Sequence, residues 1–392
     1  MKRVLFVIVL AQFLCTSVWF AGNAILPDLV AYLNLKSNFL SHLTSAVQFG
    51  FIAGTLVFAL LAIADRYSPS KVFFVSALIA GTFNLAVCIS NIPASALLGL
   101  RFLTGFFLAG IYPVGMKIAS DHFQKGLGKS LGFLVGALVV GTAFPHFLKS
   151  LTAELPWRFV IYLTSALSMI GGVLMIMLVS DGPYRKSGMA LSLISFLSGF
   201  KKWQFRSAAL GYFGHMWELY TFWAFVPVIL TTWKNQFTAV DLNVPLFSFL
   251  IIGSGGLACI FSGLLSQVYK VKTLATIFLF LSGVCCLLSP WFMNQNSIGL
   301  LLIFLFFWGL VVIADSPLFS TLVAQHAPEE SRGAALTIVN SIGFAITIVS
   351  IQLMGTLTSV LNTQKVYIVL AIGPIVGTLT LLSKNESTNN KH

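Results

Sequence analysis

Residues 298–323 read IGLLLIFLFFWGLVVIADSPLFSTLV, and the only charged side chain in this stretch belongs to Asp315. A helix that is apolar on every side is buried either in a protein core or in a membrane. A membrane-spanning helix needs about 20 mainly apolar residues, and this stretch supplies them. The stretch therefore predicts a transmembrane helix.

Eleven other stretches of the 392-residue chain have the same character. Only 9% of the residues are charged and 57% are hydrophobic, whereas a soluble domain carries roughly a quarter charged residues. Such a chain cannot cover a surface that faces water, so we expect an all-α membrane protein with twelve transmembrane helices. The predicted spans cover residues 4–30, 41–64, 72–90, 95–118, 131–150, 157–179, 206–230, 245–268, 273–292, 298–323, 333–358 and 365–383.

The positions of the basic residues support the same count. With the N-terminus in the cytoplasm, 17 of the 23 Lys and Arg residues fall on the cytoplasmic side, five fall outside and Arg101 lies within a span. Cytoplasmic loops of membrane proteins are rich in Lys and Arg. The sequence thus predicts a multi-pass protein of the cytoplasmic (inner) membrane with both termini in the cytoplasm. The net charge of +12 follows from this loop bias and does not predict nucleic-acid binding.

The chain divides at its longest hydrophilic stretch into two sets of six spans. Each set has a proline in its fourth span, Pro113 or Pro317, and a glycine 15 or 16 residues later, Gly128 or Gly333. Related halves occur in many secondary transporters, so we predict two pseudo-symmetric six-helix bundles. The predicted parts are an N-terminal bundle (1–180), a central cytoplasmic loop (181–205), a C-terminal bundle (206–384) and a cytoplasmic tail (385–392).

Three short segments resemble those of the major facilitator superfamily. Residues 64–71, ADRYSPSK, share the Asp-Arg core of the loop signature G-x-L-A-D-R-x-G-R-K, although the glycines and later arginines are replaced. Residues 101–110 resemble the element R-F-x-x-G-x-x-x-x-G, and residues 328–333 resemble the turn P-x-x-x-R-G. The resemblance implies a transporter whose two halves rock about a central cavity.

Two further segments, residues 110–117 and 211–220, are similar to those of a bacterial subgroup often labelled nitrate/nitrite-type carriers. Nitrate carriers resemble one another in an arginine in each of spans two and eight. Neither span contains arginine here, so the resemblance does not imply nitrate as the substrate.

The sequence lacks a nucleotide-binding motif, which limits the energy sources available for transport. The chain contains no G-x-x-x-x-G-K-[ST] run for binding a nucleotide. Its glycine-rich runs, at 132–141 and 253–256, instead predict close helix approach. Transport would then be driven by an ion gradient or by the gradient of the substrate itself. The sequence shows no metal-ligand cluster and no nucleophile–base spacing, so we expect no enzyme, no cofactor and no metal.

Ionisable side chains within spans are costly and usually face a cavity or a partner. Glu218 lies 12 residues into the seventh span, and His215 lies on the same helix face. Buried carboxyl and imidazole groups can exchange protons near neutral pH, which predicts a proton-coupling site. The alternative is a hydrogen-bonded pair that only fixes helix packing.

Asp315 is a second candidate. It precedes Ser316-Pro317, where the proline removes a helical hydrogen bond. We predict that Asp315 is a second protonation site or holds the inner gate. Alternatively, it caps backbone groups that the kink frees.

Arg101 has two interpretations. It contacts an anionic or zwitterionic substrate or pairs with Glu218 or Asp28, or else it tethers the backbone carbonyls of a neighbouring helix. Both interpretations permit a role in coupling.

Polar side chains recur on one face of the first span, at Gln12, Thr16, Trp19 and Asn23. Lipid would leave them unsatisfied, so we expect them to line a central cavity. Interhelical hydrogen bonding is the alternative. The other residues assigned to the cavity are Arg101, Tyr112, Phe222 and Asn340.

Asp65, Arg66 and Lys71 follow the second span and are predicted to form a cytoplasmic gate through salt links. The alternative is the ordinary positive charge of an inner loop.

Together these features predict a secondary active transporter of a small solute, coupled to protons. Its expected partners are the substrate, the proton and the lipid bilayer, with no nucleic acid, and we expect a monomer. An uncoupled facilitator or exchanger, and a non-transporting sensor of transporter descent, are the alternatives.

Overall fold

The computed structural model describes residues 2–35, 39–123, 127–152, 154–185, 200–237, 241–327, 332–361 and 364–383. All regular secondary structure within these ranges is helical. Among the described residues, ten helical segments between Phe39 and Leu382 are long and apolar enough to cross a membrane. The predicted all-helical fold is confirmed, and the count of twelve spans stays a prediction.

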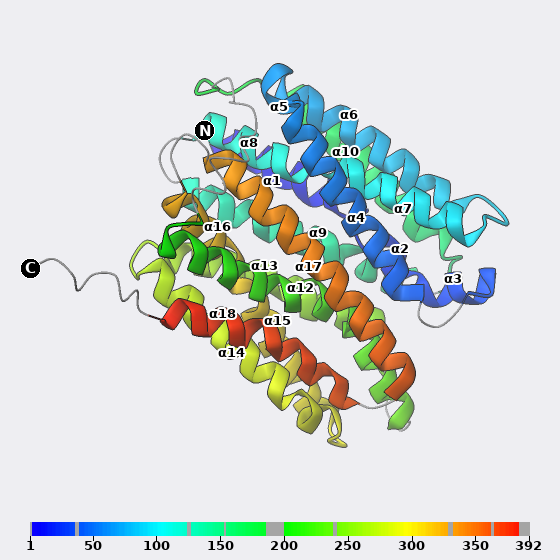
Figure 1. Cartoon of the computed structure of the whole chain (residues 1–392). Coiled ribbons are helices and arrows are strands. Elements are labelled where there is room, and N and C mark those ends of the chain that lie inside the picture. Colours follow the sequence, from blue (N-terminus) through cyan, green and yellow to red (C-terminus); the bar gives the residue numbers. More distant parts are fainter. Residues whose placement is uncertain are drawn as a thin grey trace, which may run out of the picture.

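The helices run back and forth along one common direction (Figure 1). The helices of the N-terminal part are α1 (Lys2–Thr16), α2 (Ala21–Ala24), α3 (Leu26–Leu33), α4 (Phe39–Leu60), α5 (Ile63–Arg66), α6 (Pro69–Leu85), η1 (Ala86–Cys88), α7 (Ala94–Leu108), α8 (Tyr112–His122), α9 (Leu127–Leu151) and α10 (Arg158–Leu178). Those of the C-terminal part are α12 (Trp203–Gln236), α13 (Val244–Leu265), α14 (Val271–Met293), α15 (Ile298–Ala314), α16 (Ser316–His326), α17 (Arg332–Leu361), η3 (Gln364–Ala371) and α18 (Ile372–Leu382).

The first and seventh predicted spans are not among the ten apolar segments. The first is divided into α1, α2 and α3, and each piece is too short to cross alone. The seventh lies within α12, a continuous helix of 34 residues. Polar side chains such as His215 and Glu218 lower the hydropathy of α12, although its length exceeds that of a span.

Two of the predicted spans are interrupted at their prolines. α7 ends before α8 begins with Tyr112-Pro113, and α15 ends before α16 begins with Ser316-Pro317. A proline in the first turn of a helix needs no hydrogen-bond donor, which makes these positions suitable starts for a new helix.

The two halves of the chain meet where α9 packs along α13 and α4 packs along α17, as Figure 1 shows for the latter pair. A Cβ atom added at Gly136 of α9 would lie 2.9 Å from the carbonyl oxygen of Gly256 of α13, and the reverse distance is 3.0 Å. Only glycine permits so close an approach of two backbones. The predicted role of the glycine-rich runs is confirmed at these two residues.

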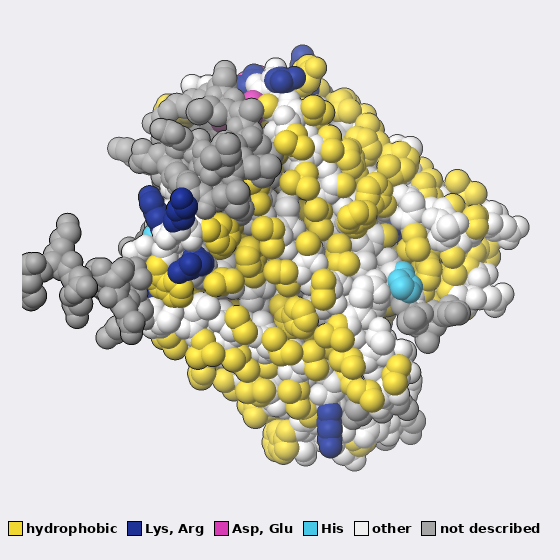
Figure 2. Space-filling view, in the orientation of Figure 1, with side chains coloured by type: hydrophobic (Ala, Val, Ile, Leu, Met, Phe, Trp, Pro, Cys, Tyr) yellow, Lys and Arg dark blue, Asp and Glu magenta, His cyan; other side chains and the backbone are white. Residues whose placement is uncertain are grey.

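On the face shown in Figure 2, an apolar band covers the middle of the helices, and the basic side chains gather mainly at the end where α1 begins. α1 begins and α18 ends at the same end of the helices (Figure 1), which we call the predicted cytoplasmic end. The opposite end is the predicted outer end. Residues 186–199 of the predicted central loop, residue 384 of the predicted C-terminal bundle, the whole predicted tail (385–392) and residues 328–331 of the family-like turn lie outside the described ranges.

Candidate functional site

A small cavity lies between the two halves of the chain. Its volume is about 20 Å³, which is room for about one water molecule. The lining residues are Tyr112 of α8, Val135 and Leu138 of α9, Tyr212, Met216, Leu219, Tyr220 and Trp223 of α12, Ile313 of α15, Ser316 and Ser320 of α16, and Asn340 and Phe344 of α17. Both halves therefore contribute, and two of the predicted cavity residues, Tyr112 and Asn340, lie in its wall.

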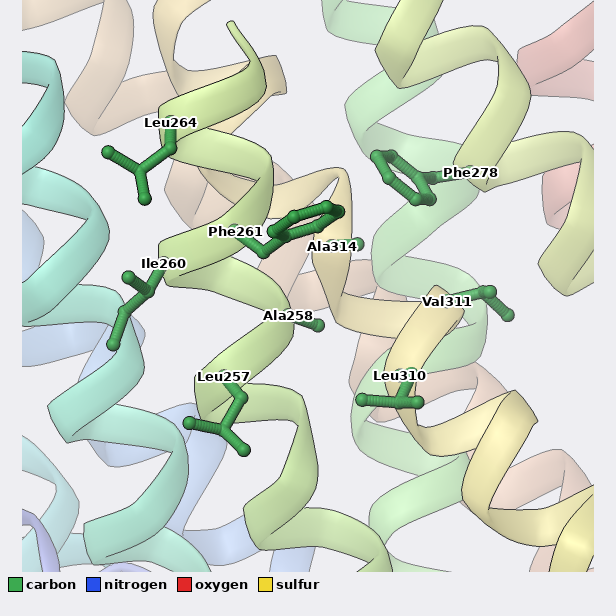
Figure 3. Close-up of a pocket in the computed structure, with 9 residues that line it drawn as sticks. All are labelled: Leu257, Ala258, Ile260, Phe261, Leu264, Phe278, Leu310, Val311 and Ala314. Atoms are coloured by element: carbon green, nitrogen blue, oxygen red, sulfur yellow. The ribbon is translucent and has the colours of Figure 1, made fainter.

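A larger hollow of about 460 Å³ lies on the side of the C-terminal helices, between α13, α14 and α15 (Figure 3). Its lining is wholly apolar: Leu257, Ala258, Ile260, Phe261, Leu264, Phe278, Leu310, Val311 and Ala314. Such a surface, on helices apolar enough to span a membrane, suits contact with lipid tails. We therefore place the candidate site at the smaller cavity, because it is the one that has polar groups and lies between the halves.

An aromatic cluster flanks the cavity. Trp19 stacks on Tyr220 and Phe344, with ring centroids 5.9 Å and 6.0 Å apart. Phe51 of α4 lies 4.8 Å from Trp19 and 4.6 Å from Phe344. The rings come from both halves, so the cluster forms part of their interface.

Hydrogen bonds also join the halves near the predicted outer end. Gln352 of α17 donates to the carbonyl oxygen of Ser41, at 3.1 Å, and to Oγ of Ser45, at 2.9 Å. Asn243 donates to Oγ of Ser150 at 3.1 Å. These bonds hold the two halves together at the outer end of the helices.

The side chains of the predicted polar stripe in the first span differ in their hydrogen bonding. Both amide atoms of Gln12 are buried without a hydrogen-bond partner among the described residues. Thr16 donates to the carbonyl oxygen of Gln12 within its own helix, and Asn23 donates to Oγ1 of Thr44 across helices at 2.8 Å. The structure thus places none of these three, nor Trp19, in the cavity wall.

Arg101 is buried and holds the break between α1 and α2. Its guanidinium donates to the carbonyl oxygens of Val18 and Trp19, at 2.9 Å and 2.6 Å, and to Oδ1 of Asn84 at 2.8 Å. These are the contacts of the tether interpretation. Asp28, one of its predicted charge partners, pairs instead with Lys149 at 2.9 Å.

Glu218 is completely buried between α12, α14 and α15. Its Oε1 accepts a hydrogen bond from Nε1 of Trp308 at 2.5 Å, and its Oε2 accepts one from Oγ of Ser282 at 2.6 Å. Phe222, predicted for the cavity, packs against Trp308 with tilted rings whose centroids are 4.5 Å apart, and it is not in the cavity wall.

His215 contacts the carboxylate of Asp315 and not that of Glu218. Its Nδ1 lies 2.8 Å from Oδ1 of Asp315, an ion-pair distance without the alignment of a hydrogen bond. Both side chains are buried, and Oδ2 of Asp315 has no partner among the described residues. The Glu218–His215 bond allowed by their spacing is therefore not formed, since each group pairs with a separate partner. The capping role considered for Asp315 is not seen either.

Sequence reasoning did not find Ser282 and Trp308. One signal was available, because Trp308 carries the single hydrogen-bonding side chain between residues 298 and 314. A buried tryptophan N–H usually has a partner. The identity of that partner depends on helix packing. Within the described ranges, no three His, Cys, Asp or Glu side chains come together as a metal site.

A comparison with protein-family models matches the two halves of the chain separately. A family model described as the Major Facilitator Superfamily matches residues 8–207 and, separately, residues 208–392. The chain belongs to the major facilitator superfamily. It is therefore a multi-pass membrane transporter and not an enzyme, by membership of this family.

This major facilitator is also similar to a solved structure, the crystal structure of the human organic anion transporter MFSD10 (TETRAN). The TM-score is 0.76 at 13% sequence identity, covering 97% of this chain and 99% of the human one. At this identity the likeness shows the fold alone. No curated protein matches the chain. The resemblance to nitrate/nitrite-type carriers is not confirmed by these matches.

The family-like loop of this major facilitator makes its ion pair with a residue that was not predicted. Oδ1 of Asp65 lies 2.9 Å from Nζ of Lys117 of α8, within the same half. Arg185 donates to the carbonyl oxygens of Asp65 and Tyr67. Arg66 and Lys71 are exposed and form no ion pair with another described residue. The gating role of this loop stays a prediction.

Proposed function

We propose that this major facilitator is a proton-coupled secondary transporter of a small solute, working by alternating access in the cytoplasmic membrane. The observation that carries the proposal is the complete burial of Glu218 inside a membrane protein. Ionisable groups in such positions are expensive, and they usually belong to ion or proton pathways.

The contacts of Glu218 suit a group that gains and loses a proton. Trp308 can only donate, so Oε1 keeps its hydrogen bond while it stays unprotonated. Ser282 can donate or accept, so Oε2 is the oxygen that can take the proton. The serine hydroxyl would then accept from Glu218 and donate to the carbonyl oxygen of Leu279, 3.3 Å away. Both protonation states thus have a complete set of hydrogen bonds.

A second titratable pair, His215 and Asp315, also lies beside the cavity. Asp315 immediately precedes Ser316, and His215 immediately precedes Met216, and both of these neighbours line the cavity. Rearrangement of the pair would move α12 against α15 and α16, which form one side of the cavity. This placement supports a link between the protonation of His215 and Asp315 and access to the site.

The arrangement of the halves supports alternating access. The hydrogen bonds of Gln352 and Asn243 and the ring contacts of Trp19 hold the halves together near the predicted outer end. In our proposal these contacts break when the site opens outward. At the cytoplasmic end, where we place both termini, the Asp65–Lys117 pair joins a loop to α8 within one half and would shape the inner gate.

The test is transport by the purified chain in liposomes, with a panel of small metabolites and an imposed pH gradient. We expect uptake that follows the gradient in the wild type. Glu218→Gln should lose gradient-driven accumulation while retaining solute exchange. Asp241→Asn, which removes an exposed carboxylate, is the matched control.

Two outcomes would contradict the proposal. Normal accumulation by Glu218→Gln would return Glu218 to a packing role. Flux that ignores the pH gradient in the wild type would indicate a facilitator or an exchanger.

A further inference from the structure

The central cavity is rich in aromatic rings. Five of its lining residues, Tyr112, Tyr212, Tyr220, Trp223 and Phe344, are aromatic. None of the described residues that line it is Lys or Arg. The faces of aromatic rings attract cations, including quaternary ammonium groups.

An acidic residue, Asp315, directly precedes a lining residue of the cavity along the chain. Asp315 lies between Ile313 and Ser316, which both line the cavity. Its Oδ1 lies 2.8 Å from Nδ1 of His215, and its Oδ2 is buried without a partner among the described residues. Buried polar atoms are nearly always hydrogen-bonded, so an unpaired carboxylate oxygen calls for an explanation. A cationic ligand would supply one.

The basic residues that could have attracted an anion are engaged elsewhere. Arg101 donates to backbone carbonyls, and Lys117 and Lys149 pair with carboxylates. The anionic substrate considered from the sequence depended on Arg101 as a cavity contact, and Arg101 is not in the cavity wall.

The helix dipoles do not reverse this preference. The start of a helix attracts anions and its end attracts cations. α15 ends and α16 begins at Asp315, so the two opposite partial charges meet there and largely cancel.

We propose that the cavity binds an organic cation with an aromatic or methylated ammonium group. The rings of Tyr220, Trp223 and Phe344 contact the ligand. Asp315 lies directly behind the wall, next to Ser316, and balances the charge of the ligand in place of His215 once the halves separate. This inference rests on the proposed transport function and names the class of its substrate. The indole N–H of Trp223, which has no partner among the described residues, would donate to an acceptor atom on the same ligand.

The closed cavity holds about one water molecule, so a ligand with a ring enters only when the halves separate. The measured affinity therefore includes the cost of that opening. A comparison of two ligands of the same shape and opposite charge removes this common cost.

The experiment measures binding of phenyltrimethylammonium and of benzenesulfonate to the purified full chain in detergent by calorimetry. Both probes carry one phenyl ring and one compact charged head group. We expect the cation to bind at least about tenfold more tightly than the anion, since one favourable charge contact is worth about that much. Equal binding, or tighter binding of the anion, would overturn the proposal.

Variants assign the binding to the named residues. Asp315→Asn should weaken cation binding about tenfold, whereas the exposed Asp241→Asn should leave it unchanged. Tyr220→Phe should retain most of the affinity and Tyr220→Leu should lose it, which tests the ring if Asp315→Asn does not fold. Cation binding that is unchanged in both Asp315→Asn and Tyr220→Leu would refute the site.

Failure of this inference is distinct from failure of the transport proposal. Gradient-driven uptake of another solute, without cation binding, would overturn only the substrate class. Cation binding without any effect of the pH gradient on flux would overturn only the proton coupling.

Discussion

The tether of Arg101 allows a quantitative prediction. The substitution Arg101→Met keeps much of the side-chain length and removes three hydrogen bonds, two of them to backbone carbonyls at the break between α1 and α2. A hydrogen bond to a charged group contributes about 1.5–3 kcal/mol. We take the lower end, because Nε of Arg101 is itself buried without a partner among the described residues. The expected loss of unfolding free energy is about 5 kcal/mol.

This loss converts to a shift in thermal stability. The entropy of unfolding is about 2.1 cal/mol/K for each residue, or about 0.8 kcal/mol/K for 392 residues. The melting temperature in mild detergent should therefore fall by about 6 °C. Arg101→Lys should recover only part of the loss, because a single ammonium group cannot reproduce the fork of a guanidinium.

The assay is thermal unfolding of purified variants, followed by tryptophan fluorescence and size-exclusion chromatography. Transport by the same variants separates the two roles considered for Arg101. One result would show that Arg101 acts through its charge on the substrate. In that result Arg101→Met has the melting temperature of the wild type but does not transport, whereas Arg101→Lys transports fully. The tether argument would then be refuted.

Three further predictions concern the contacts that join or gate the halves. Gly136→Val should abolish transport in a folded protein by forcing α9 away from Gly256 of α13; transport at the wild-type rate in liposomes would show that this approach is dispensable. Gln352→Ala removes two hydrogen bonds at the predicted outer end, so maleimide labelling of a cysteine introduced nearby should rise about tenfold. Unchanged labelling would show that these bonds do not hold the outer end closed. Lys117→Ala removes its ion pairs with Asp65 and with the buried Asp121, so it should lower stability by more than about 1 kcal/mol and alter the transport rate. Normal transport by that variant would remove the pair from the gate.

Much of the fold was accessible from the sequence because lipid imposes simple requirements. A stretch such as residues 298–323 has few options other than a buried helix, and the prolines mark where α8 and α16 begin. The glycines of α9 and α13 likewise follow from local composition, since close packing needs small residues. These properties depend on neighbours along the chain.

The hydrogen-bond partners of the buried polar groups could not be predicted from the sequence. The spacing of His215 and Glu218 placed both on one side of α12 but left open which neighbour each would contact. Asp315 and Trp308 both come from the tenth predicted span, and Ser282 is 64 residues away from Glu218 along the chain.

The sequence by itself determined that this chain is an all-helical membrane protein and which ionisable groups its spans contain. Tertiary structure alone decided that Arg101 donates to backbone carbonyls, that Glu218 and His215 have separate partners, and that the cavity is aromatic without a described basic residue in its wall. The physical reason is that hydropathy is summed over adjacent residues. A hydrogen bond depends on the rotation and register of helices that are distant in the chain, and these are set only when the whole bundle packs.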